Sequence, residues 1–181
     1  MKLQGILGDI RETAFIVIDL KDAVLTIQDG TTPTALSITV KIGEGNLTYT
    51  ESRNVEYILD RGLLDEVRLG DEIPLDVNFD FVWEYISGNT TTTTNVPTVE
   101  DALKAQNNAA AWTSTDSDIC RPFAVDLILT HTPACATADS ETITFPDFRW
   151  DSLDHDLRAG TVACVGRSNA TEATKVRAVQ P

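Results

Sequence analysis

One short segment of the chain has side chains that could do chemistry. Asp151, Asp154, His155 and Asp156 lie within six residues, and their carboxylate and imidazole groups are typical metal ligands in proteins. The segment has neither the spacing nor the glycine of an EF-hand loop. Clustered aspartates also bond their own backbone in turns. The cluster therefore predicts either a metal site or, as the simpler interpretation, a structural turn.

Motifs for nucleophilic catalysis or phosphate binding are missing from the sequence. The other histidine, His131, falls on the apolar face of an expected strand, which predicts a core or interface residue. There is no G-x-S-x-G motif, and no cysteine has an obvious base. Gly43-Glu44-Gly45 is followed by Asn46 and Leu47, not by a lysine, so it predicts a hairpin turn. We expect no enzymatic activity, no metal and no cofactor.

The cysteines and the first residues of the chain indicate in which cellular compartment the protein resides. Cys120, Cys135 and Cys164 cannot all pair within one chain, and none has the C-x-x-C spacing of zinc or redox sites. Free thiols in a reducing cytoplasm are the simpler interpretation, and a Cys120–Cys135 disulfide outside a cell stays open. No apolar stretch of signal-peptide length precedes Asp9, so we expect no classical secretion.

Charge and composition exclude several classes of protein. The 181 residues include 28 acidic and 14 basic ones, a net charge of -14, which disfavours binding to phosphate backbones and anionic membranes. At 42% the apolar fraction is too high for a disordered acidic chain, and no apolar run is long enough to span a membrane. A soluble globular protein remains.

The charge is unevenly distributed along the chain. Residues 65–84 hold seven acidic residues and Arg68, a net charge of -6. Residues 157–181 hold four basic residues and Glu172, a net charge of +3. Complementary patches of this kind could set the register of a subunit that assembles head to tail, although acidic runs are more often solvated faces.

The elements that position these residues are mostly strands. From Glu72 to Tyr85 every odd position is a large apolar residue, which predicts one long strand with a single buried face. Pro74 places one end of it at a strand start or an edge. Alternation over 36–42 and 47–50, around the glycine turn, predicts a hairpin, and Val55, Tyr57 and Leu59 continue the pattern up to a turn at 60–62.

The second half of the chain continues the same pattern after one helix. Thr98 can cap a short helix over 99–105, and strands are expected from Phe123, around Ile143 and Phe145, and over 161–165. No shift in composition divides the chain. The sequence therefore predicts one mainly β domain over 1–181, a β-sandwich or barrel with one short flanking helix.

Several sequence blocks together resemble one protein family. They are Gly43-Glu44-Gly45-Asn46-Leu47-Thr48-Tyr49, Asn54-Val55-Glu56-Tyr57-Ile58-Leu59-Asp60-Arg61-Gly62, Asp80-Phe81-Val82-Trp83-Glu84-Tyr85 and Ser152-Leu153-Asp154-His155-Asp156-Leu157-Arg158-Ala159-Gly160. These blocks resemble the major tail (tail tube) proteins of long-tailed bacteriophages over residues 9–178. The resemblance implies a tail-tube type β-sandwich or barrel and a non-enzymatic subunit of stacked hexameric rings that conduct double-stranded DNA. It also implies tail initiator, tape measure and terminator proteins as partners, no membrane, and a virion tail made in the host bacterial cytoplasm.

This hypothesis assigns two groups of site residues. The even positions Glu72, Asp76, Asp80 and Glu84 share one face of the long strand, and we expect them to line the DNA channel, because an acidic wall repels phosphate. Pairing of some of them with basic residues of an adjacent subunit stays open, above all for Glu72. The chain from Gly43 to Gly62 is expected to project and dock on the next ring, with Glu44, Gly45 and Asn46 in the inter-ring contact.

Two alternatives come from other classes of protein. A bacterial surface or carbohydrate-binding β-sandwich predicts exposed aromatic residues on one face and a monomer in solution. A hydrolase with Asp154 and His155 as acid and base predicts loss of turnover on His155→Ala.

Overall fold

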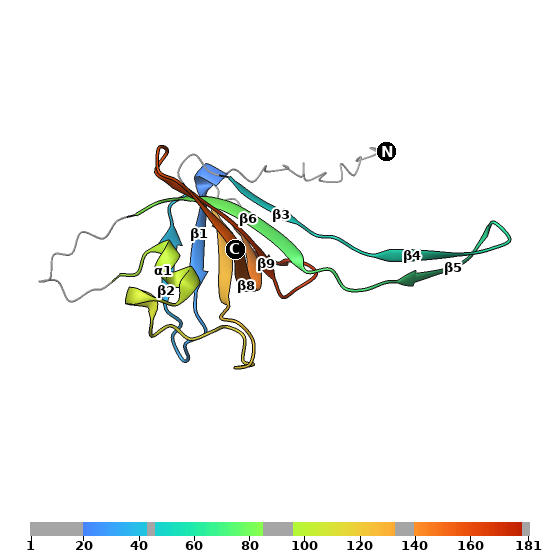
Figure 1. Cartoon of the computed structure of the whole chain (residues 1–181), viewed down its shortest axis with the longest axis horizontal. Helices are drawn as coiled ribbons and strands as arrows, with labels where there is room; N and C mark the ends of the chain where they lie inside the picture. The colour runs from blue at the N-terminus through green and yellow to red at the C-terminus, as the bar shows by residue number, and fades with distance from the viewer. Residues whose placement is uncertain (1–19, 43–45, 85–95, 133–139, 179–181) are drawn as a thin grey trace, which may run out of the picture.

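The computed structural model describes residues 20–42, 46–84, 96–132 and 140–178 (Figure 1). The elements in chain order are η1 (Leu20–Asp22), β1 (Ala23–Gln28), β2 (Ser37–Val40), β3 (Leu47–Thr50), β4 (Val55–Asp60), β5 (Leu63–Leu69), β6 (Leu75–Val82), α1 (Val99–Lys104), η2 (Asn107–Ala109), β7 (Val125–His131), β8 (Ser140–Asp156), β9 (Thr161–Ser168) and β10 (Thr174–Ala178). The fold is mainly β with one short α-helix, as the alternation in the sequence predicts.

Antiparallel pairing joins most strands in the order β2-β1-β7-β8-β9-β6-β3, with β10 on β8. Strand β8 has 17 residues and a bulge between Trp150 and Ser152. Its first part pairs with β7 and β10 and its second part pairs with β9, so β8 belongs to both halves of the sheet. The bulge bends the strand, which lets the two halves face each other.

The two ends of this strand order approach each other. Beyond the end of β2, the carbonyl of Lys41 accepts a hydrogen bond from the Val82 N–H of β6 at 2.8 Å. The Asn46 carbonyl, just before β3, accepts one from the Asp80 N–H at 3.0 Å. Lys41, which follows edge strand β2, therefore lies beside β6 near the other end of the strand order, and the body has a partly closed, barrel-like form.

The core lies between the two halves of the sheet. Strand β6 contributes Leu75, Val77, Phe79 and Phe81, all essentially fully buried, as the period of two predicts. The other members come from β1, β2, β7, β8, β9, α1 and η2, together with Trp112 in the loop that follows η2. Phe79 lies 6.0 Å from Phe81 and 5.9 Å from Phe148 between ring centroids, within the range of favourable aromatic pairs.

Helix α1 covers part of this core, and its start follows from the sequence. The Thr98 hydroxyl accepts from the Asp101 N–H at 3.1 Å, and the Asp101 carboxylate accepts from the Thr98 N–H at 3.3 Å. This capping box satisfies two backbone donors that the helix itself cannot satisfy. The helix is shorter than its predicted range, because Ala105 adopts a left-handed conformation that ends it.

Two predictions about strands need correction. The segments 36–42 and 47–50 do not form a hairpin, because β2 pairs with β1 and β3 pairs with β6. The long strand does not reach from Glu72 to Tyr85, because the described strand is Leu75–Val82. It begins directly after Pro74, as expected of a residue without an amide hydrogen, and Ile73 lies outside it.

Candidate functional site

A two-stranded arm formed by β4 and β5 extends away from the body (Figure 1). Within the part of the chain that the structure describes, the two strands pair only with each other, and a bulge follows Ile58. Arg61 and Gly62 at the tip have positive φ angles of 52° and 84°, as in the two-residue turns that match the twist of a hairpin. A hairpin that pairs with no other strand has little intrinsic stability in water.

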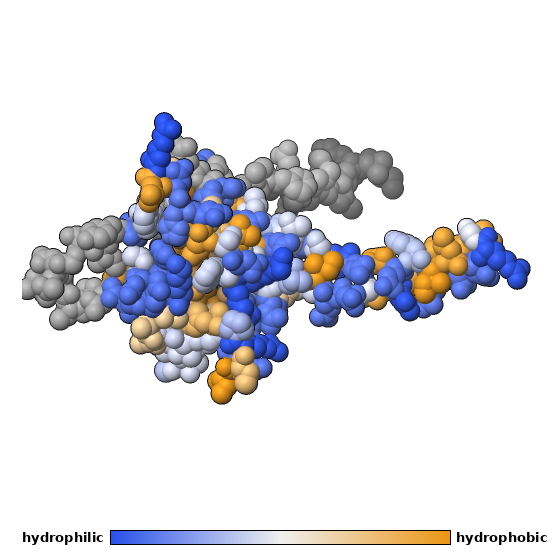
Figure 2. Space-filling model, in the orientation of Figure 1, coloured by the Kyte–Doolittle hydropathy of each residue, from blue (hydrophilic) through white to orange (hydrophobic). Residues whose placement is uncertain are grey.

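One face of the arm is apolar and exposed. Cross-strand pairing places three pairs together on it: Val55 with Leu69, Tyr57 with Val67, and Leu59 with Leu64. Apart from Val55, each of these side chains is between 50% and 71% exposed, and Figure 2 shows apolar residues along the arm. On the other face Arg68 donates to Glu56 at 2.7 Å. A continuous apolar face of this kind is typical of an interaction surface.

A pocket of about 380 Å³ lies at the base of the arm. It is lined by the segments that enter and leave the arm and by the turn before β10: Glu51, Ser52, Arg53, Asn54, Leu69, Gly70, Asp71, Glu72, Ile73, Thr171 and Glu172. Four of these residues are acidic and one is basic, so the pocket is negatively charged, with Leu69 and Ile73 as its large apolar residues.

Ion pairs connect the base of the arm to the segment around β10. The Glu51 carboxylate accepts from the Ala173 N–H at 3.1 Å and from the Lys175 ammonium at 3.2 Å. These two donors lower the pKa of Glu51, and the carboxylate raises the pKa of Lys175. Arg53 pairs with Glu172 at 3.3 Å. These contacts link the root of the arm to the body.

The four acidic residues predicted to line a channel are not equivalent. Asp76 and Asp80 share one face of β6, as predicted, but Arg167 of β9 pairs with Asp76 at 3.0 Å within the same chain. Glu84 lies beyond the end of β6 and is paired with Lys41. Glu72 precedes the strand and lines the basal pocket. Only Asp80 has neither a basic partner among the described residues nor a place in this pocket.

The face of β6 that carries Asp76 and Asp80 also holds Asn78. Its side-chain oxygen is buried and has no hydrogen-bond donor in the described part of the chain. Neighbouring strands place Thr48 of β3 and Val165 of β9 beside it. The face is therefore mixed in chemistry, with less net negative charge than the sequence pattern predicts.

Of the residues predicted for the inter-ring contact, the structure describes only Asn46, and it lies outside the arm. Asn46 is exposed just before β3, whereas Glu44 and Gly45 lie outside the described residues. The prediction that 43–62 forms the projecting hairpin is therefore wrong in its boundaries, since the projecting pair is β4 and β5, residues 55–69. The role of residues 44–46 in docking stays a prediction.

The acidic segment around His155 is a strand and not a turn. Residues 151–156 belong to β8, and only Asp156, at its end, bonds a following turn through the N–H groups of Arg158 and Ala159. His155 lies 3.4 Å from a Glu100 carboxylate oxygen, and its ring forms a T-shaped contact with Trp83 at 5.4 Å between centroids. Among the described residues no group of three or more His, Cys, Asp and Glu side chains could hold a metal ion. His131 is buried, as predicted.

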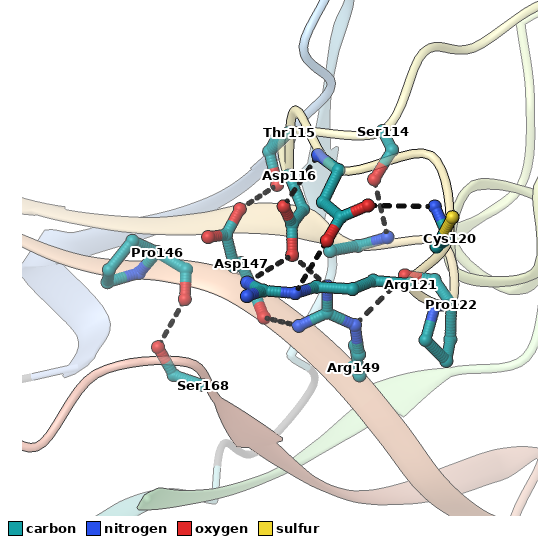
Figure 3. Close-up of polar contacts among 12 residues, drawn as sticks. Ser114, Thr115, Asp116, Cys120, Arg121, Pro122, Pro146, Asp147, Arg149 and Ser168 are labelled. Carbon is teal, nitrogen blue, oxygen red and sulfur yellow. Dashed lines mark hydrogen bonds and ion pairs between the residues drawn. The ribbon is translucent and has the colours of Figure 1, made fainter.

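A polar network fixes the loop between η2 and β7 (Figure 3). Asp116 accepts from Arg149 of β8 at 2.6 Å and from Arg121 at 3.2 Å. The N–H of Asp118 and these two guanidinium groups lower the pKa of Asp116. These contacts hold the loop in place, and Ile119 in the loop is 97% exposed.

The sequence contains a signal for the arm, but apolar alternation alone does not show where the apolar face of the arm lies. A turn at 60–62 between two segments with apolar residues is a hairpin signal. Alternation shows that Tyr57 and Leu59 share a face, but it does not show whether that face lies in the core or at an interface. The structure places both on the exposed face of the arm.

Comparison with known proteins gives a structural likeness but no family. No protein-family model matches the chain. No curated protein matches it either. Among solved structures it is similar to a chain of "Cryo-EM structure of the anti-feeding prophage (AFP) baseplate, 6-fold symmetrised", with a TM-score of 0.41 and 9% identity over 85% of this chain and 91% of that chain. A likeness of this size does not define a shared function. Within the described residues no helix is long and apolar enough to cross a membrane.

Proposed function

We propose that this chain is the structural subunit of a phage tail tube. It polymerises into stacked hexameric rings whose acidic channel conducts double-stranded DNA from the capsid into the host. Its partners are further copies of itself and the tail initiator, tape measure and terminator proteins. It is made in the host bacterial cytoplasm and resides in the virion tail, and it has no enzymatic activity. The sequence blocks that resemble tail tube proteins support this assignment.

The observation that carries the proposal is the arm. This hairpin pairs with no other strand among the described residues and exposes Tyr57, Leu59 and Leu69, so it has no core of its own. Burying such an apolar face against another molecule is favourable by roughly 25 cal/mol per Å² of apolar surface. An arm of this kind is expected of a subunit whose native state is an assembly.

The charge of the chain supports the proposed channel. A net charge of -14 repels DNA phosphates, whereas a basic wall would hold the DNA through release of its counterions. Asp80 is the residue of the predicted set best suited to a water-filled channel, because a carboxylate without a basic partner is costly to bury against a neighbour. Arg167 reduces the contribution of Asp76.

Electron microscopy of negatively stained, purified protein tests the proposal. A concentration series should show particles of monomer size at low concentration and tubes with a central channel at high concentration. A protein that stays monomeric at every concentration, also after addition of preformed tail tips, would contradict the proposal.

A carbohydrate-binding β-sandwich is the second candidate. Trp83 and Trp150 are 43% and 39% exposed, and exposed aromatic residues are what this function requires. Both rings already contact polar side chains, Trp83 that of His155 and Trp150 that of Lys104. Glycan-array binding by a monomer, lost on Trp83→Ala, would favour this candidate over the tube subunit.

A further inference from the structure

We infer that the tip of the arm of one copy binds in the pocket at the base of a second copy's arm. Arg61 is the charged anchor and Leu63 the apolar one. This inference rests on the proposed self-assembly and names the surface that receives the arm.

The pocket has a free negative charge. Of its four carboxylates, Glu51 is paired with Lys175 and Glu172 with Arg53. Asp71 and Glu72 have no basic partner among the described residues, and both are exposed. Two adjacent carboxylates without a cation attract a basic group from another molecule. Leu69 and Ile73 line the same pocket, so it can also receive an apolar side chain.

The tip carries the complementary groups. Arg61 is exposed and has no acidic partner in the described part of the chain. Next to it across Gly62, Leu63 is 75% exposed. A guanidinium can bind two carboxylate oxygens at once, which fixes the orientation of the contact in addition to stabilising it. The tip therefore presents one cation and one large apolar side chain two residues apart.

A tip that binds in the pocket has to come from a second copy. The paired part of β4 has six residues, which separates the tip from the base by roughly 20 Å at 3.3 Å per residue. An arm cannot fold back on its own root without losing its strand pairing. Tip and base are different surfaces, so the contact between copies is heterologous, and repetition of it extends an assembly.

Charge reversal on each side tests the inference. Arg61→Glu and the double variant Asp71→Arg/Glu72→Arg should each raise the concentration needed for tube formation at least tenfold. An equimolar mixture of the two variants should assemble better than either alone, because the tip of each variant then meets a pocket of opposite charge on the other variant. Combining all three changes in one chain should restore assembly toward that of the unchanged protein. Arg61→Lys, which keeps the charge but cannot bind two carboxylate oxygens in the same geometry, should assemble better than Arg61→Glu.

A matched control is Arg158→Glu, which reverses an exposed arginine in the β8–β9 turn, away from the arm and the pocket. It should assemble as the unchanged protein does, and circular dichroism should show the same fold for all variants. Tubes that form normally with Arg61→Glu, or single variants that are not restored by combination, would overturn the inference and leave the proposed function intact. Failure of the unchanged protein to assemble, also after addition of preformed tail tips, would instead overturn the proposed function.

Discussion

Asp29, which is 3% exposed, organises the connection between β1 and the loop before β7. Its two carboxylate oxygens accept from the N–H groups of Thr31, Leu36 and Thr113 and from the Thr31 hydroxyl. Burial acts to raise the pKa of Asp29, but these four donors outweigh it and lower the pKa below its ordinary value of 3.8. The ionised carboxylate therefore stabilises the folded state.

We predict that Asp29→Asn lowers the free energy of unfolding at neutral pH by about 2–3 kcal/mol, because the amide nitrogen cannot accept from the buried donors. In the unchanged protein the contribution of Asp29 is present above pH 3.8 and is lost as the pH falls through the lowered pKa. The difference between the two proteins should therefore narrow below that pH. Urea unfolding between pH 3 and pH 7 measures this, and Asp154→Asn, an exposed aspartate in β8, is the control. Equal stability of the two proteins at pH 7 would contradict the prediction.

A second prediction concerns Asp80 and the channel. If Asp80 lines the channel, Asp80→Lys should leave tube assembly unchanged but slow DNA passage and lower infectivity, most strongly at low salt, because the added cation binds phosphate. Asp80→Asn, which removes the charge without reversing it, should have a much smaller effect. Loss of assembly with an unchanged fold would place Asp80 at a subunit interface.

At the scale of elements, the arm and the body should respond separately to mutation. We predict that Tyr57→Ser combined with Leu59→Ser changes the melting temperature of the monomer by no more than about 2 °C, because both side chains are exposed and lie outside the core. The same variant should fail to polymerise. Differential scanning calorimetry and light scattering measure the two effects.

The control for this variant lies on the same arm. Glu56→Gln with Arg68→Gln changes the polar face, where an exposed ion pair contributes little, and should still polymerise. If this control and the Tyr57 and Leu59 variant polymerise equally well, the apolar face is not an assembly surface.

The sequence predicts an element well where local signals define it and poorly where contacts with distant residues define it. The sequence alone predicts β6, β7 and α1 well, because Phe79, Leu127 and the Thr98 cap act locally or through a simple period of two. It does not predict which strands pair. Strands β2 and β3, which were predicted to pair with each other across a glycine turn, pair with β1 and β6 instead, because long-range contacts decide their partners.

The candidate site was predictable only in part, for a related reason. A period of two placed Asp76 and Asp80 on one face, as observed. It contained no information about Arg167, which comes from a strand almost a hundred residues later and neutralises Asp76. The basal pocket combines residues from both ends of the arm with residues near the C-terminus, so no local motif could indicate it.

At the scale of the whole molecule, assembly should be slow to start. The net charge of -14 makes free subunits repel one another, and a ring needs several contacts before it closes. We predict that light scattering of concentrated protein shows a lag phase, and that sheared tubes added as seeds remove it. Filament growth without a lag and without any effect of seeds would contradict this prediction.

The arm gives the molecule a polarity that an assembled tube would inherit. If every tip occupies the base of the next copy, all copies point the same way, and the last ring at one end leaves its pockets empty while the ring at the other end leaves its arms free. The two ends then differ in chemistry, one acidic and concave, the other projecting, with Arg61 and Leu63 at its tips. A protein that starts a tube and a protein that stops it would consequently need opposite surfaces, and neither could take the place of the other.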